Sequence, residues 1–341
     1  MRALLLPIVV VAAALASART QEQAAAGDAR FRGAARDFLA ALRPQSRAQA
    51  SFAFDDAQRL DWHFIPRDRK GLPLGAMNDD ERRAAHALLR SFLTPRGYGR
   101  ALGVIELEGV LREIENNPGR DQGRYFFSVF GDLAGDAPWS LRFEGHHLAL
   151  NFTGVGAAGI APTPFFLGSN PAEVKSGPRA GFKLLAPHEE LARALVKSLT
   201  AEQRKKAVVS ETAPADVLFG PGTVADATSE QGLPLSELTS EQIDLAVELI
   251  SELQDDVATL ETRRMIHHSI LGRVREPSAT RFAWAGGVEP GQGHYWRLAG
   301  PEAILEYDNT QGGANHVHFL WRDPKNDFAA DWLARHHRDE H

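Results

Sequence analysis

A segment near the C-terminus carries two histidines separated by one residue, His316 and His318. In a β-strand, side chains alternate between the two faces, so both imidazoles would point to one side, about 7 Å apart. Val317, Phe319 and Trp321 would take the other side and form the core-facing surface. Two neutral imidazoles in this relation can bind one divalent metal ion. The spacing therefore predicts part of a metal site on the polar face of a strand.

The segment before this strand supplies carboxylates that could complete the site. Glu306 and Asp308 alternate with the apolar Leu305 and Tyr307, as in an adjacent antiparallel strand. If the apolar faces match, the carboxylates lie beside the histidines, where either could be a fourth ligand, a general base or a partner that orients a ring. Arg322 lies on the histidine face and could stabilise a developing anion.

Two other segments could supply a third imidazole ligand. His146 and His147 lie in the predicted strand at residues 139–152, where adjacent side chains would face opposite ways, so only one could join the site. His147 is favoured because it shares its face with the polar Asn151, whereas His146 would share the apolar face. His294, on the predicted strand at residues 294–298, is the other candidate.

The same residues also allow a reading without a metal. Arg281, Arg297 and Arg322 could pair with Glu306 or Asp308 and form a buried ion network. An exposed histidine pair without any role is a further alternative.

The amino-acid composition limits the kinds of site and partner that the chain can have. The chain has 341 residues, 43% hydrophobic and 24% charged, with a net charge of −6, which is typical of a folded globular protein. It has no basic stripe, which argues against nucleic acid as a partner. It has no cysteine, so a thiol nucleophile is excluded and any metal site must use nitrogen and oxygen ligands. Such a site favours zinc, with copper or iron as alternatives.

The N-terminus has the pattern of an export signal. An arginine precedes an apolar run at residues 3–15, and Ala16-Ser17-Ala18 offers small residues for cleavage. We expect a signal peptide at residues 1–18, a linker at 19–27, and export to the periplasm or outside the cell. The apolar run is short for a transmembrane helix, so no stable membrane span is expected after cleavage.

Periodicity predicts helices and strands in separate runs, which favours an α+β fold, an antiparallel meander packed with several helices in a single domain at residues 28–341. Helix caps are expected at Asn78 with Glu81 and at Thr239 with Gln242. No internal repeat is evident. The predicted helices are residues 30–42, 82–93, 97–115, 187–199, 200–207, 238–271 and 327–337, and the predicted strands are 62–66, 125–130, 139–152, 281–285, 294–298, 304–307 and 316–321.

Four separated motifs resemble one family. The segments at residues 144–152, 284–287, 306–311 and 315–318 are similar, in this order, to the domain of unknown function 3500 family, DUF3500. The resemblance runs from about residue 28 to the C-terminus. It implies a family of mostly exported or membrane-associated proteins and implies no activity or catalytic residue.

The leading functional hypothesis is a metal-dependent hydrolase that uses metal-activated water, acting on a small-molecule or polymer substrate. A copper or iron oxidoreductase on the same site is one alternative. A non-catalytic metal- or ligand-binding protein is the other.

Overall fold

One large sheet forms the centre of the molecule. The computed structural model describes residues 5–226, 231–257, 279–301 and 303–340. The strands within these ranges form a 13-stranded mixed sheet in the order β1-β3-β4-β5-β7-β13-β12-β11-β10-β8, with β2, β6 and β9 attached at its sides. Because this sheet is continuous and packs with several helices, the α+β, single-domain prediction is confirmed.

The helices are α1 (Leu5–Ala41), α2 (Pro44–Ala50), α3 (Asp79–Phe92), α4 (Pro95–Glu115), α5 (Ala186–Ser198), α6 (Ala201–Ala207), α7 (Ser240–Val257) and α9 (Ala330–Glu340). The long strands are β3 (Phe126–Phe130), β4 (Trp139–Gly145), β5 (Leu148–Gly154), β7 (Phe165–Ser169), β10 (Arg281–Gly286), β11 (His294–Gly300), β12 (Ala303–Gln311) and β13 (His316–Arg322). The short strands are β1 (Ser51–Phe52), β2 (Leu72–Pro73), β6 (Ile160–Ala161), β8 (Val208–Ser210) and β9 (Leu233–Pro234).

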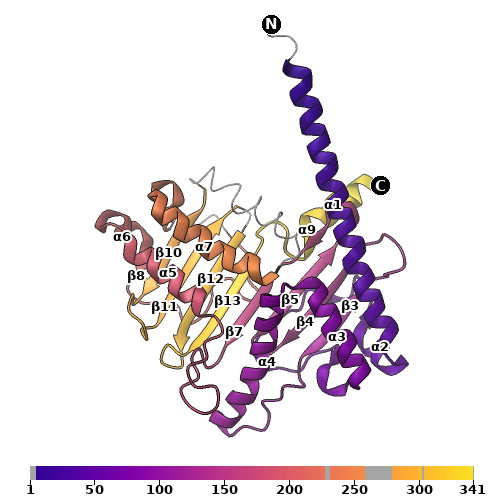
Figure 1. Cartoon of the computed structure of the whole chain (residues 1–341), viewed down its shortest axis with the longest axis horizontal. Helices are drawn as coiled ribbons and strands as arrows, with labels where there is room; N and C mark the ends of the chain where they lie inside the picture. The colour runs from indigo at the N-terminus through magenta and orange to yellow at the C-terminus, as the bar shows by residue number, and fades with distance from the viewer. Residues whose placement is uncertain (1–4, 227–230, 258–278, 302, 341) are drawn as a thin grey trace.

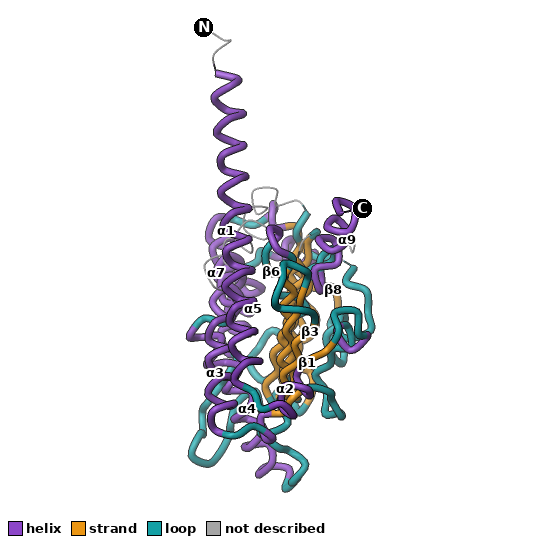
Figure 2. The backbone as a smooth tube through the Cα atoms, turned by 90° about the vertical axis from the view of Figure 1, so that its right-hand side faces the viewer, coloured by secondary structure: helices purple, strands orange, loops and turns teal. Residues whose placement is uncertain are grey.

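The two faces of the sheet are covered differently. Helices α1, α3, α4, α5 and α7 pack on one face, and α9 lies on the other (Figures 1 and 2). The main apolar core fills the helix-covered face, where Phe143, Leu167 and Phe319 are buried. On the other face, which we call the loop face, the loops at residues 53–71 and 211–226 cover a smaller cluster that includes Phe64 and Phe166.

The molecule contains an internal repeat that the sequence does not reveal by eye. From each edge of the sheet toward its centre, the strands follow one another in chain order. They are β1-β3-β4-β5-β7 from one edge and β8-β10-β11-β12-β13 from the other (Figure 1). In each half, a short strand pairs in parallel with the first meander strand, β1 with β3 and β8 with β10. The last strand is β7 in the first half and β13 in the second half, and these two strands pair with each other at the centre of the sheet.

Local details support this correspondence. Leu72 of β2 is opposite Phe127 of β3, and Leu233 of β9 is opposite Phe282 of β10. A 3-10 turn and then a helix follow in both halves. The two predicted caps are present: Asn78 caps α3, and Thr239 exchanges hydrogen bonds with Gln242 at the start of α7. The two halves therefore share one architecture and lie side by side in one sheet.

Several predicted elements differ from the observed ones. The predicted strand at 139–152 is two strands, β4 and β5, joined by a two-residue turn, and residues 62–66 form an irregular loop. The predicted linker at 19–27 is helical, because its alanine-rich sequence contains no proline to end α1. The predicted helix at 238–271 is observed as α7, and its part from residue 258 onward lies outside the described residues.

Within the described ranges, no helix is both long and apolar enough to cross a membrane.

Candidate metal centre

His147 lies in the turn between β4 and β5 rather than on a strand. Its φ of 61° is in the left-handed region, which a tight two-residue turn requires. Its backbone N–H donates to the carbonyl of Phe64 at 2.8 Å, and its carbonyl accepts from the N–H of Gly168 at 2.7 Å. These contacts fix the turn between a loop of the loop face and strand β7.

Gly168 creates the space that the His147 ring occupies. It lies on β7, directly between β5 and β13, and is paired with His318 of β13. A Cβ atom at Gly168 would stand 2.8 Å from Cγ and Cδ2 of His147, which is closer than real Cβ contacts. The missing side chain therefore lets the His147 ring lie across β7 and reach the histidines of β13.

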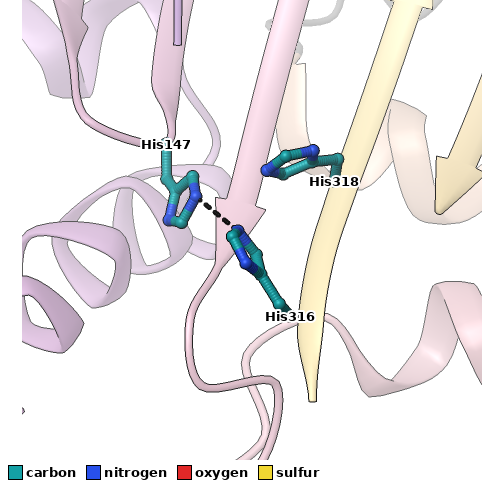
Figure 3. Close-up of side chains that lie close together, drawn as sticks. All are labelled: His147, His316 and His318. Atoms are coloured by element: carbon teal, nitrogen blue, oxygen red, sulfur yellow. Dashed lines mark hydrogen bonds between the residues drawn. The ribbon is translucent and has the colours of Figure 1, made fainter. Parts of the chain in front are cut away.

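Three imidazoles converge at this point. His147, His316 and His318 each offer one nitrogen, and these nitrogens all lie within 4.8 Å of one another. The rings point toward a shared space between the β4–β5 turn and the start of β13 (Figure 3). We call these three residues the histidine group. Because His147 comes from the first repeat and the other two come from the second, the group lies between the two halves of the molecule.

Two of the three imidazoles lie near the spacing of metal ligands, whereas the nitrogens of the whole group are within 4.8 Å of one another. Nε2 of His316 lies 2.8 Å from Nε2 of His147, so one ring donates a hydrogen bond to the other. Two nitrogen ligands of a tetrahedral zinc ion stand about 3.3 Å apart. Separating the two rings by about half an ångström would therefore replace the shared proton with an ion.

Burial keeps two of these imidazoles neutral. Desolvation, followed by the charges of neighbouring histidines, lowers the pKa of His147 well below its ordinary value. Desolvation, followed by the charge of His318, lowers the pKa of His316 to about 3. Neutral imidazole is the form that binds a metal, so both rings are in the required state near neutral pH.

Asp216 orients the third ring. Nδ1 of His318 lies 2.6 Å from Oδ1 of Asp216, in the loop at residues 211–226. A carboxylate only accepts, so this hydrogen bond places the ring proton on Nδ1 and leaves the lone pair of the neutral ring on Nε2. Nε2 is buried and has no hydrogen-bond partner among the described residues. A carboxylate–histidine pair of this kind is the usual support of a metal ligand.

Sequence reasoning missed Asp216. It is 102 residues from His318 along the chain and lies in an irregular loop, so no strand or helix period marks it. Asp216 reaches His318 only in the folded chain, where its loop lies over β13.

Asp308 lies beside the histidine group as expected. It is paired with His318 across β12 and β13. Its Oδ1 accepts from the backbone and hydroxyl of Thr310 at 3.0 and 2.8 Å, whereas Oδ2 is buried without a partner among the described residues. Burial raises the pKa of Asp308 to about 6. Asp308 is not one of the residues whose ligand atoms cluster, so it neighbours the site rather than completing it.

Glu306 and Arg322 have other contacts. Glu306 accepts from the backbone N–H groups of Leu218 and Phe219, both at 2.9 Å, and from the Tyr295 hydroxyl at 2.5 Å. Desolvation raises its pKa. Both carboxylate oxygens are engaged, so Glu306 fixes the covering loop to the sheet and is not placed as a ligand or base.

Arg322 lies at the far end of β13 and pairs with Asp327. It also donates to the carbonyls of Phe219 at 2.6 Å and Thr223 at 3.4 Å. These contacts use the guanidinium to hold a loop, which corrects the expectation that Arg322 could stabilise a developing anion.

His146 stacks behind the histidine group. Its ring lies 3.8 Å from that of His147, and its Nδ1 is 2.6 Å from Oε2 of Glu108 on α4. The two adjacent histidines do not face opposite ways, because they occupy a turn and not a strand. His146 is outside the group of converging nitrogens.

His294 is on the other face of the sheet. Its ring is fully buried, stacked 4.6 Å from Trp284 and 5.4 Å from Tyr307. Tyr307 hydrogen-bonds to Glu189 of α5, which identifies this as the helix-covered face. The structure therefore does not bring His294 to the histidine group, and it acts as a core residue.

Fold and site together define an α+β protein with a repeated architecture and a three-imidazole group between its two halves. The chain belongs to the family described as "Protein of unknown function (DUF3500)", whose model matches residues 24–330, and the resemblance is confirmed. No curated protein and no solved structure matches the chain.

Three of the four segments that resemble the family, at residues 144–152, 306–311 and 315–318, contribute residues to the histidine group or beside it. Asn315 accepts from the backbone N–H of Glu173 at 2.7 Å and donates to its carbonyl at 3.2 Å. The N–H of Ala172 donates to the carbonyl of Asn315 at 2.8 Å. The segment that follows β7 thus holds the chain just before His316 and sets the direction of that imidazole.

Proposed function

We propose that this protein binds one divalent metal ion, preferentially zinc, through His147, His316 and His318, and that it is a metal-dependent hydrolase. The observation that supports this proposal is the convergence of three imidazole nitrogens within 4.8 Å. Three imidazole ligands leave a fourth position of a tetrahedral ion open, as in catalytic rather than structural zinc sites. A zinc ion held in this way would lower the pKa of water and so supply a nucleophile near neutral pH.

The surrounding residues have distinct roles in this proposal. Asp216 keeps the proton of His318 on Nδ1, so that Nε2 is available. Phe64 and Phe166 pack against the His318 ring at centroid distances of 4.9 and 5.3 Å and limit the access of bulk water. Asp308 has one free buried oxygen on the same face and is the candidate for holding a proton during the reaction.

Hydrolysis is the simplest reaction for such a site. It adds one water molecule across an ester or phosphoester bond and yields an acid and an alcohol, with no electron transfer. The same nitrogen ligands would accept copper or iron, which would favour oxidative chemistry instead. The identity of the bound metal separates these two proposals.

Hydrolysis of 4-nitrophenyl acetate and bis(4-nitrophenyl) phosphate tests this function. We expect turnover by zinc-loaded protein that a chelator abolishes and added zinc restores. The variant His316→Ala/His318→Ala should lose about 100-fold or more in rate, since the metal would no longer be held. A matched control, His336→Ala/His337→Ala, removes two histidines of α9 and should keep the wild-type rate. Absence of turnover by the zinc-loaded protein, or equal rates in both variants, would contradict the proposal.

We also propose that the protein is exported and that residues 1–18 are removed. The support is the apolar run followed by small residues at positions 16–18. Mass spectrometry of protein recovered from the periplasm or medium should give a chain that begins at residue 19. Full-length protein retained in the cytoplasm would contradict this.

A further inference from the structure

A cavity of about 440 Å³ lies next to the histidine group. It is formed by the loop at residues 66–69, helix α4, the loop at residues 117–125 and the ring of His146. Sites for small molecules commonly measure about 300–1,000 Å³. His146 belongs to both places, because its ring lines the cavity and also stacks on His147 at 3.8 Å.

The lining of the cavity is rich in arginine. Arg67, Arg69, Arg120 and Arg124 contribute to it, together with three acidic residues, Asp68, Glu108 and Asp121. The positive and negative side chains are nearly equal in number. Whether the cavity prefers an anion therefore depends on which of these side chains are already paired.

The arginines differ in how many of their N–H groups already donate hydrogen bonds. Arg69 is the most engaged, because it pairs with Glu144 and donates to four backbone carbonyls. The NH2 group of Arg67 contacts Asp61 at 2.9 Å and its Nε is buried, whereas its NH1 group has no hydrogen-bond partner among the described residues. Arg124 is half exposed and shows one contact, to Asp68 at 3.0 Å. Arg67 and Arg124 therefore keep donors for a ligand.

The acidic residues that line the cavity are partly engaged, and Asp68 pairs with Arg124 at 3.0 Å. Glu108 is bound to His146 at 2.6 Å, and Oδ1 of Asp121 accepts from the N–H of Gly123 at 2.8 Å. The side chain of Asp68 is fully exposed to solvent. Arg120, at the wall nearest the histidine group, donates to both carboxylate oxygens of Glu115 at 2.8 and 3.0 Å, and its NH1 lies 3.2 Å from Nδ1 of His146. The cavity thus keeps N–H donors on Arg67 and Arg124 that are not used by the contacts to Asp61 and Asp68.

We propose that this cavity is the substrate pocket of the histidine site and that it binds the anionic group, a carboxylate or a phosphate, of a small substrate. Arg67 and Arg124 hold this group by charge-assisted hydrogen bonds, and the reacting bond extends past His146 toward the histidine group. This proposal rests on the metal-dependent hydrolase proposed above, because the bound anion belongs to a substrate only if the histidine group is catalytic. Anion binding in the cavity can be measured without a metal.

Isothermal titration calorimetry with inorganic phosphate and with acetate, at constant ionic strength and pH 7.5, tests this pocket. We expect saturable binding of at least one of the two anions by the wild-type protein, and the preferred anion identifies the substrate group. Arg67→Gln/Arg124→Gln should weaken that binding about tenfold or more, because two charge-assisted hydrogen bonds are lost. Arg83→Gln is the matched control, since Arg83 is an exposed arginine paired with Asp80 on α3, and it should bind as the wild type does.

Two further measurements keep the outcomes distinct. His316→Ala/His318→Ala should bind the anion normally, so failure of metal binding alone would leave the pocket intact. The arginine variants should retain the metal, so failure of anion binding alone would leave the proposed function intact. If the double arginine variant does not fold, Arg124→Gln alone carries the test, with a loss of about threefold or more expected. No binding of either anion by the wild type, or equal binding by the arginine variants, would overturn the inference.

Discussion

At the scale of single residues, the site depends on how each imidazole is held. His318 is fixed by Asp216, His147 by the turn and by Gly168, and His316 by the Asn315 contacts. The two histidines on β13 could be predicted to share a face from their alternation in the sequence. His147 was favoured over His146 on an argument about strand faces that does not apply, because both residues occupy a turn. Asp216 could not be predicted, since only tertiary packing brings its loop to β13.

Asp216→Asn should weaken zinc binding about 10- to 100-fold, because the amide no longer fixes the proton of His318 on Nδ1 with a charged acceptor. Competition with a fluorescent zinc chelator measures this. Asp331→Asn, which alters a partly exposed aspartate paired with Arg335 on α9, is the control and should bind zinc like the wild type. Equal zinc affinity in the two variants would show that Asp216 does not support the site.

Gly168→Ala should displace the His147 ring. The added methyl group would stand 2.8 Å from the ring, whose backbone is fixed on both sides. We expect zinc affinity to fall about tenfold or more, since one of three ligands is moved. Gly33→Ala, on α1, has open space at its Cβ position and should leave zinc binding unchanged. Normal zinc affinity in Gly168→Ala would contradict the placement of His147.

At the scale of the elements, the facing of each strand decides which residues meet. The four strands of the C-terminal meander were predicted from alternation and short turns, and β10 to β13 confirm them. His294 alternates with the apolar Trp296 and Leu298, and the structure assigns all three to the helix-covered face. The missed hairpin at residues 146–147 has no glycine or asparagine in its turn, so ordinary turn signals were absent.

His294→Phe tests this assignment. Burial lowers the pKa of His294 to about 4, below the value of about 6.5 expected in the unfolded chain. Its contribution to stability is therefore complete above pH 6.5 and is lost as the pH falls toward 4. Relative to His294→Phe, the wild-type free energy of unfolding should fall by about 3 kcal/mol between pH 7 and pH 4.

Urea unfolding at several pH values measures this difference. The variant should fold, because a phenyl ring fits between Trp284 and Tyr307, and it should bind zinc at pH 7.5 like the wild type. Loss of zinc binding in His294→Phe would mean that His294 belongs to the metal site after all.

At the scale of the whole molecule, two similar halves share one sheet and form the histidine group where they meet. The repeat is defined by strand order and pairing. The clearest trace is Leu72-Pro73-Leu74 against Leu233-Pro234-Leu235, each followed by a helix with a capping arrangement. Register and strand order carry the similarity, and neither is visible until the strands are paired.

Zinc should stabilise the folded chain, because the three ligands come together only in the native state. At a free zinc concentration about 100 times the dissociation constant, the free energy of unfolding should rise by about 2.7 kcal/mol. Thermal unfolding at pH 7.5 would show this as a higher midpoint that a chelator reverses. His316→Ala/His318→Ala should show no such shift, and an equal shift in that variant would place the zinc elsewhere.

The metal content of the protein, purified without a histidine tag, tests the central claim most directly. Elemental analysis should find about one divalent ion per wild-type chain, with zinc the expected element, and should find the same amount in His294→Phe. His316→Ala/His318→Ala should contain almost none. Equal and negligible metal in the wild type and in this double variant, also after incubation with zinc, would contradict a metal site between the two halves of the sheet.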